Sequence, residues 1–76
     1  MNRGIGETAG KVWVVLGEKG ELNISQIPRL LKIKPREAYQ AVGWLAKEGK
    51  IHQEEKDGKA FVSLTGEEIE VFKNLF

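Results

Sequence analysis

The amino-acid sequence predicts a mainly helical fold with a small antiparallel β-hairpin near its C-terminal end. Apolar residues recur at helical spacing up to about residue 49, and the pattern then changes to that of strands. An Asp-Gly pair stands between the two strand-like runs, which is a strong sign of a hairpin. With 76 residues and no cysteine, the chain is expected to form a single domain over residues 1–76, stabilised by packing without disulfides.

The first helix is expected over residues 5–16. Its apolar stripe consists of Ile5, Ala9, Val12, Trp13 and Leu16. Gly17 and Gly20 are expected to end it, because glycine favours the left-handed conformation found just beyond helix ends. Residues 21–23 leave room only for a short strand or a connector.

A short second helix is expected next, with an apolar face formed by Ile24, Ile27, Leu30 and Leu31. Asn23 is a candidate N-cap, with Gln26 as its capping-box partner. Pro28 is tolerated in the first turn of this helix. If Pro28 lies further along, Ser25 becomes the better cap, and the sequence leaves both open.

The third helix is expected to begin at Pro35, after a tight connection at residues 32–34, because proline favours the first helical position. Glu48 should end it, and Gly49 stands where a left-handed capping glycine is expected. Its buried side consists of Ala38, Ala41, Val42 and Leu45. Residues 23–49 therefore predict a helix-turn-helix unit.

A hairpin is expected over residues 51–64, with its turn at Asp57 and Gly58. A hairpin directly after two short helices is the winged helix-turn-helix arrangement, in which the hairpin is the wing.

A terminal helix is expected over about residues 66–76. Thr65 and Glu68 have the spacing of a second capping box, which would open this helix with Ile69, Phe72 and Phe76 on one side. The core predicted for the whole chain consists of Ile5, Val12, Trp13, Leu16, Ile27, Leu30, Leu31, Ala38, Val42, Leu45, Ile51, Phe61 and Leu64.

Two segments carry a pattern more specific than a general helix-turn-helix. They are Ile5-Gly6-Glu7-Thr8-Ala9-Gly10-Lys11-Val12-Trp13 and Ala41-Val42-Gly43-Trp44-Leu45-Ala46-Lys47-Glu48-Gly49-Lys50-Ile51. From Ile5 to about Leu64 the chain resembles a family of short bacterial and archaeal winged helix-turn-helix proteins of unknown function. The resemblance implies the fold, and it implies no ligand, operator or catalytic residue. The terminal helix departs from the shortest members.

Positive charge is concentrated in one segment of a chain whose formal charge is only +1. Six basic and two acidic residues between Arg29 and Lys50 give that segment a net charge of +4. In a winged helix the third helix enters the major groove, while the preceding turn and the wing approach the backbone. The sequence therefore predicts duplex DNA binding in transcriptional regulation, by a dimer, because one small reader makes few phosphate contacts.

The residues expected to contact DNA come from three places. Arg29, Lys32, Lys34 and Arg36 would neutralise phosphates, Tyr39 and Gln40 would face base edges, and Lys56 and Lys59 would lie at the wing tip. The competing interpretation of these charges is a solvated surface without a ligand.

A protein-interaction module on the same scaffold is the alternative function. Gly43 and Trp44 occupy positions where many DNA readers carry polar side chains, and they form the candidate interface with a second copy or another protein. Acidic residues at Glu54, Glu55 and Asp57 also oppose DNA at the wing.

The surroundings of Trp44 should decide between the two functions. If Trp44 packs with Trp13 against Gly6 and Gly10, both tryptophans belong to the core, whereas an exposed Trp44 favours an interface. The two glycines lie one turn apart and are expected to let another helix come close.

Enzymatic, metal-binding and cofactor-binding roles are not predicted. His52 is the one histidine and there is no cysteine, so neither a metal site nor a catalytic triad can be assembled. Residues 6–11 depart from a phosphate-binding loop, because three residues separate their glycines where that motif has four. The longest apolar run, residues 12–16, is too short to cross a membrane, so we expect a cytoplasmic protein without a small-molecule ligand.

Overall fold

The computed structural model describes residues 3–76, and their side chains from residue 6 onwards. Its elements are, in chain order, α1 (Arg3–Lys19), β1 (Leu22–Asn23), a 3-10 turn η1 (Ile24–Gln26), α2 (Ile27–Leu31), α3 (Pro35–Lys47), β2 (Ile51–Lys56), β3 (Lys59–Leu64) and α4 (Gly66–Leu75). The predicted fold class, mainly helical with an antiparallel β wing, is confirmed.

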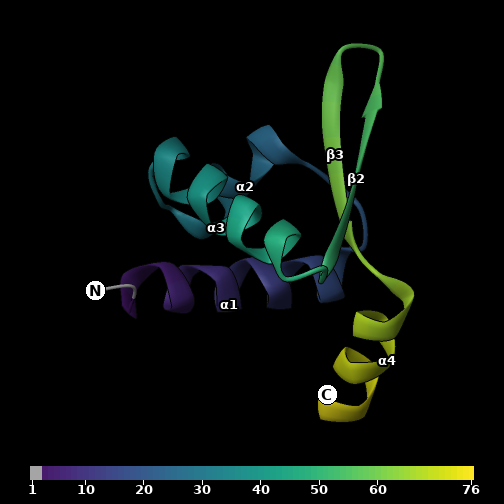
Figure 1. Cartoon of the computed structure of the whole chain (residues 1–76). Coiled ribbons are helices and arrows are strands. Elements are labelled where there is room, and N and C mark those ends of the chain that lie inside the picture. The colour runs from purple at the N-terminus through teal and green to yellow at the C-terminus, as the bar shows by residue number, and fades with distance from the viewer. Residues whose placement is uncertain (1–2) are drawn as a thin grey trace.

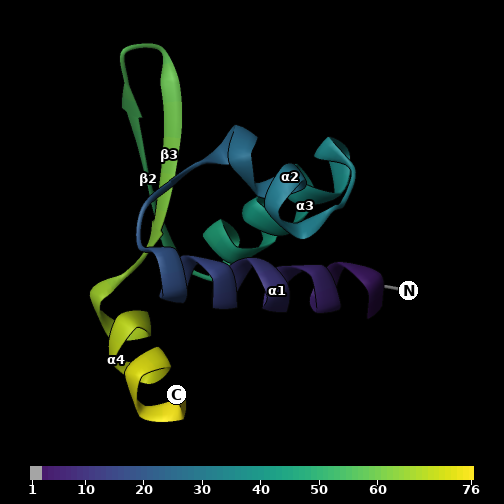
Figure 2. The same ribbon diagram turned by 180° about the vertical axis from the view of Figure 1, so that it is seen from behind.

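The elements are arranged around α1. In Figure 1, α2 and α3 lie on one side of α1, and α4 lies on the other side, near the C-terminal end of α1. The hairpin of β2 and β3 extends well away from the helices, and the view from behind in Figure 2 shows the same arrangement. The wing therefore projects from the helical body.

The first helix is longer than predicted. It runs through Gly17 and ends at Gly20, whose φ is +84° and whose N–H donates to the carbonyl oxygen of Leu16 at 2.8 Å. The prediction that Gly17 helps to stop the helix is therefore wrong. Gly17 instead makes room for α4, because a Cβ at this position would overlap the ring of Phe72.

Asn23 caps the entry to the helix-turn-helix unit. Its side-chain oxygen accepts a hydrogen bond from the N–H of Ser25 at 3.0 Å, and the Gln26 side chain accepts one from the N–H of Asn23 at 2.9 Å. This capping box opens η1, and Pro28 then falls in the first turn of α2, where its missing N–H costs nothing. The choice between Asn23 and Ser25 is thereby decided for Asn23.

The third helix agrees with its prediction. It begins at Pro35, and the Glu37 carboxylate accepts a hydrogen bond from the N–H of Lys34 at 2.9 Å. Beyond its end Gly49 has φ of +71° and donates its N–H to the carbonyl oxygen of Ala46 at 3.0 Å. The buried residues are the predicted ones, Ala38, Ala41, Val42 and Leu45.

The three strands form one antiparallel sheet in the order β1-β3-β2. Ile51 pairs with Leu64 at the base of the wing, and Lys56 pairs with Lys59 at its tip. Asp57 and Gly58 connect the strands with φ of +51° and +75°, as the predicted Asp-Gly turn requires.

Phe61 is not a core residue, contrary to the prediction. Val62 and Leu64 are buried, whereas Phe61 is only partly buried, because alternate residues of a strand face opposite sides of a sheet. Phe61 and Leu64 are three positions apart and cannot share a face. On the outer face of the wing, the Phe61 ring centroid lies 5.4 Å from Nζ of Lys56.

The terminal helix docks on α1 through aromatic and polar contacts. Trp13 Nε1 donates a hydrogen bond to Oε1 of Glu68 at 2.7 Å, and the rings of Trp13 and Phe72 meet edge-to-face with centroids 5.5 Å apart. Phe72 also stacks on Phe76 at 4.7 Å. These contacts hold α4 against α1.

The second capping box is only half formed. The Thr65 side chain accepts a hydrogen bond from the N–H of Glu68 at 3.3 Å, as predicted. The Glu68 carboxylate is bound to Trp13, and the N–H of Thr65 donates to the carbonyl oxygen of Lys50 at 3.2 Å. The tertiary contact to the indole thus replaces the local one.

The core lies where α1, α2, α3 and the sheet meet. Its buried residues are Ala9, Val12, Val15, Leu16, Leu22, Ile27, Ala38, Ala41, Val42, Leu45, Ile51, Val62 and Leu64. Trp13 and Leu31 are partly buried at its edge, and the side chain of Ile5 lies outside the described part of the chain. Leu30 is 44% exposed, so its predicted core position is wrong: Ile27 and Leu31, one turn apart, take the inner face of α2.

Candidate nucleic-acid interface

The exposed side of α3 carries a basic and polar stripe. At helical periodicity Arg36, Gln40, Gly43 and Lys47 fall opposite the buried side of this helix, and all four are exposed. No acidic residue belongs to the stripe. Glu37, the acidic residue of the first turn, lies on a flank and is engaged with the backbone of Lys34. The stripe can therefore approach a polyanion without like-charge repulsion.

The turn before α3 presents two lysines to solvent. Ile33 packs against the core, and its N–H donates to the carbonyl oxygen of Pro28 at 3.0 Å. Lys32 and Lys34, on either side of this anchor, are both exposed. Lys32 has φ of +57° and ψ of +48°, a left-handed conformation that ends α2. This tight turn places Lys32 and Lys34 directly before the N-terminus of α3.

Arg29 and Tyr39 come together at the junction of α2 and α3. They line one shallow hollow of about 360 Å³. Tyr39 is 51% exposed and Arg29 is exposed, so neither is committed to the core. Tyr39 thus lies on the flank of α3 that faces α2, beside the stripe rather than within it.

The two wing lysines differ. Lys56 forms an ion pair with Glu21 at 3.2 Å and a longer one with Glu54 at 3.9 Å. Lys59 is exposed and has no ion pair among the described side chains. Exposed ion pairs are worth only about 0–1 kcal/mol, so a phosphate can compete for Lys56.

The acidic wing residues are solvated. Glu54, Glu55, Asp57 and His52 are all exposed on or beside the hairpin. Within residues 3–76 no group of three or more acidic, histidine or cysteine residues is placed to hold a metal ion. None of the described helices is long and apolar enough to span a membrane.

Gly43 and Trp44, predicted to share an interface, lie on different sides of α3. Gly43 belongs to the exposed stripe, where a Cβ would meet no atom within 4 Å. Trp44 is 40% exposed and lines a groove of about 350 Å³ between α1, α3 and α4, together with Trp13. Trp44 is therefore exposed and does not pack against Gly6 and Gly10, although all three line this groove.

No other helix of the same chain lies close to Gly6 or Gly10. A Cβ at either position would meet no atom within 4 Å in the described part of the chain, so the expected close approach does not occur within one chain. A mid-helix glycine costs roughly 1 kcal/mol relative to alanine, and among the described residues no contact accounts for that cost here.

Lys47 was not among the predicted DNA contacts. Its position could have been found from the sequence, because residues 36, 40, 43 and 47 follow the i, i+4, i+7, i+11 spacing of one helix face. The stripe it completes runs most of the length of α3.

A family of proteins described as a winged helix-turn-helix domain (DUF2582) matches residues 1–64. The chain belongs to this DUF2582 family. The match extends from α1 to the end of β3 and leaves α4 outside it. A relative, the uncharacterized protein MJ1608 of Methanocaldococcus jannaschii, is 42% identical over 66 residues, which are 79% of this chain and 89% of that protein.

Solved structures show the same fold as this DUF2582 protein. Protein BT2368 of Bacteroides thetaiotaomicron is 33% identical, with a TM-score of 0.79 over 87% of this chain and 80% of that one. ZitR of Lactococcus lactis is 22% identical with a TM-score of 0.81, covering 93% of this chain and 55% of its own. The transcriptional regulator HlyU of Vibrio vulnificus is 18% identical with a TM-score of 0.79, covering 91% and 72%. The chain spans about half the length of ZitR, and the last two likenesses establish the fold alone.

Proposed function

We propose that this protein binds duplex DNA in transcriptional regulation, with α3 in the major groove and the wing beside the backbone. The observation that carries the proposal is the exposed stripe of α3, which holds Arg36, Gln40 and Lys47 and no acidic residue. Winged helices dock with this helix face.

Each cationic group has a role in this docking. Lys32 and Lys34 neutralise phosphates beside the N-terminus of α3, and Lys59 does so from the wing tip. Arg36 can make a bidentate contact with guanine, and Gln40 can make one with adenine. The exposed Gly43 lets the α3 backbone approach the groove closely.

The remaining predicted residues act from the flanks. Arg29 lies beside Tyr39, so the two reach the backbone next to the stripe rather than the base edges that were expected for Tyr39. Lys56 contributes once a phosphate replaces Glu21 as its partner.

Similar folds support the proposal at the level of architecture. HlyU of Vibrio vulnificus, described as a transcriptional regulator, has the same arrangement of helices and wing. Fold similarity at this identity carries no binding residue from that protein to this chain, so the proposal rests on the residues of α3 and the turn. The activity proposed is binding alone, exerted by residues 1–76 as one domain in the cytoplasm, where bacterial and archaeal DNA lies.

A dimer is part of the proposal. One copy offers few phosphate contacts, and such contacts lose much of their affinity at physiological salt. Two copies on adjacent half-sites would combine their affinities.

Protein binding through Trp44 is the second candidate function. Its indole is 40% exposed in a groove that also contains Trp13, and partly exposed tryptophans are enriched in protein interfaces. This groove lies on the flank of α3 away from Tyr39, so the two functions use different surfaces.

Anisotropy titrations of a labelled random-sequence duplex across a salt series test the docking. Lys34→Ala and Arg36→Ala should each weaken binding and reduce the slope of log K against log salt by about 1, because on a random sequence each of these cations neutralises about one phosphate. Lys73→Ala, which removes a lysine from the exposed part of α4, is the control and should bind like the unaltered protein. Unchanged affinity and slope in both test variants would contradict the docking.

A further inference from the structure

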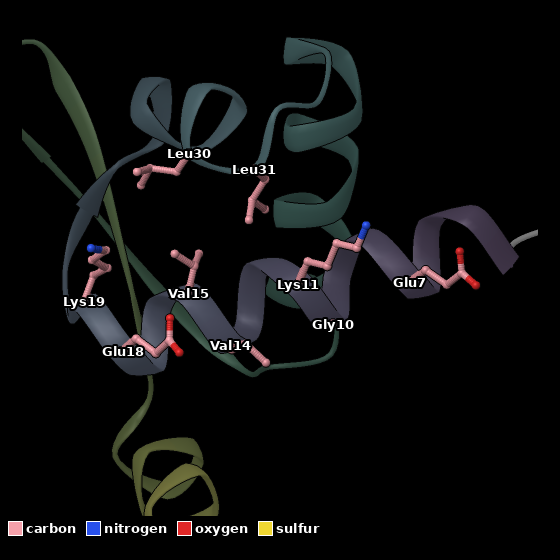
Figure 3. A pocket seen from close by; sticks show the side chains of 9 residues that line it. All are labelled: Glu7, Gly10, Lys11, Val14, Val15, Glu18, Lys19, Leu30 and Leu31. Carbon is pink, nitrogen blue, oxygen red and sulfur yellow. The ribbon is translucent and has the colours of Figure 1, made fainter. Parts of the chain in front are cut away.

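The groove between α1 and α2 is open, apolar at its floor and charged at both ends. It has a volume of about 1030 Å³. In Figure 3, Leu31 extends from α2 towards α1, Val15 extends from α1 towards α2, and Leu30 lies beside them along the edge of α2. Leu30 is 44% exposed although it is a large apolar side chain. This surface therefore has the composition of an interface that is unoccupied within one chain.

Both ends of the groove carry charged side chains of α1, and the charge nearest the middle of the helix is positive at one end and negative at the other. Glu7 and Lys11 lie near the N-terminal end of α1, and Glu18 and Lys19 lie near its C-terminal end, as Figure 3 shows. No ion pair or hydrogen bond engages these four side chains within the part of the chain whose side chains are described. Their charges are available to a partner.

We propose that two copies of this chain pair through this groove, with their α1 helices antiparallel about an axis between Val14 and Val15. In that arrangement Lys11 of each copy lies opposite Glu18 of the second copy, since both are equally far from the axis. Val14, beside this axis, and the exposed Leu30 are the apolar side chains that the pair can bury.

The charge pattern favours a second copy of this chain as the partner, and it favours the antiparallel orientation. A two-fold axis presents one surface to itself, so the surface must be complementary to its own copy. The same α1 face in a parallel pair would place Lys11 against Lys11 and Glu18 against Glu18, which repel. The antiparallel pair instead places Lys11 of each copy against Glu18 of the second copy, and these two contacts attract.

Gly10 supports the same arrangement. It lines the groove one turn from Val14, and a Cβ there would meet nothing within 4 Å inside the chain. A glycine without a neighbour in its own chain leaves a flat patch on which a second helix can lie close.

The pair leaves the proposed DNA surface free. None of the residues lining the groove belongs to the exposed stripe of α3 or to the wing. The inference stands on the α1 surface and does not depend on DNA binding, so either can fail without the other.

Sedimentation analysis of the full chain over a wide concentration range, without DNA, tests the proposal. The unaltered protein should show a concentration-dependent dimer. Lys11→Glu or Glu18→Lys alone should weaken dimerisation by about tenfold, because each creates two like-charge contacts. The double variant Lys11→Glu with Glu18→Lys should restore it, since the charges again alternate across the axis.

Charge changes elsewhere serve as controls. Glu70→Lys and Lys73→Glu make the same changes in net charge on α4 and should leave the dimer unchanged, and circular dichroism checks that every variant is folded. A monomer at all concentrations would overturn the proposal. A dimer that ignores the single exchanges, or that the double variant fails to restore, would also overturn it and place the contact on another surface such as the Trp44 groove.

Discussion

At the end of α2 a lysine occupies a backbone conformation that usually belongs to glycine. Lys32 has φ of +57°, and an L-residue in this region costs roughly 1–2 kcal/mol. The turn it makes brings Lys34 and Pro35 to the start of α3. A cationic side chain at this strained position is consistent with a role for its charge in the proposed docking.

Lys32→Gly separates the two effects of this residue. We expect the variant to be more stable to urea by up to about 1 kcal/mol, because glycine relieves the left-handed strain. We expect it to bind duplex DNA more weakly, because one phosphate contact is lost. Gly49→Ala, which introduces a Cβ at φ of +71°, is the opposite control and should lose stability. Equal or stronger DNA binding by Lys32→Gly would remove this lysine from the interface.

Only glycine fits at position 17, because of a contact with a residue that is distant in the sequence. A Cβ there would overlap the Phe72 ring, which comes from a helix more than fifty residues away. Gly17→Ala should therefore destabilise the protein by about 1–3 kcal/mol in urea unfolding, as overpacking does.

The control for Gly17→Ala lies on the same helix. Gly6→Ala meets no neighbour within 4 Å and should stabilise the protein by about 0.5–1 kcal/mol through helix propensity. Destabilisation of equal size in both variants would mean that α4 does not pack on Gly17.

Local signals were sufficient for caps and turns but not for contacts between distant residues. The capping box at Asn23, the proline at the start of α3 and the Asp-Gly turn follow from neighbouring residues, and all three are confirmed. The carboxylate of Glu68 is different, because it bonds Trp13 across 55 positions instead of completing the local box. Such a choice depends on the packed fold, which the local pattern does not contain.

At the scale of elements, α4 is held by a small number of contacts. None of its residues is buried, and it touches α1 chiefly through Phe72 and the hydrogen bond of Glu68 to the Trp13 indole. The family match ends before this helix, which agrees with its place outside the winged-helix core.

Glu68→Ala should loosen this helix. Loss of the charged acceptor leaves a partly buried indole N–H without its partner, so we expect a loss of about 1–3 kcal/mol in the free energy of unfolding and an altered tryptophan emission. Glu67→Ala removes a neighbouring exposed carboxylate from the same first turn and should cost at most about 1 kcal/mol. Indistinguishable urea curves and emission spectra for the two variants would contradict the docking of α4.

Strand and helix faces set how far the core could be predicted. On α3 the four buried positions follow one clear stripe and were all foreseen. Phe61 was wrong because Leu64 is three positions along the strand and faces the other side of the sheet, and Leu30 was wrong because Ile27 and Leu31 take the inner face of the short helix α2. The periodicity of each element contained the correct answer in both cases.

At the scale of the molecule, the surfaces are divided among the elements. The exposed stripe of α3, the Lys32 to Lys34 turn and the wing tip are proposed for DNA, while the α1 groove is proposed for a second copy. The predicted candidates Arg36 and Gln40 share the stripe, whereas Lys56 forms an ion pair with Glu21, 35 positions away, which no local pattern predicts.

A titration of the isotopically labelled protein with a random-sequence duplex at low salt, followed by amide and indole chemical shifts, tests the central claim most directly. We expect shifts at Arg29 to Gln40, at Lys47 and at Lys56 to Lys59, and we expect them to fade as salt rises because the contacts are to phosphates. An absence of shifts at low salt, or shifts confined to the indoles of Trp13 and Trp44, would contradict DNA binding through α3 and the wing.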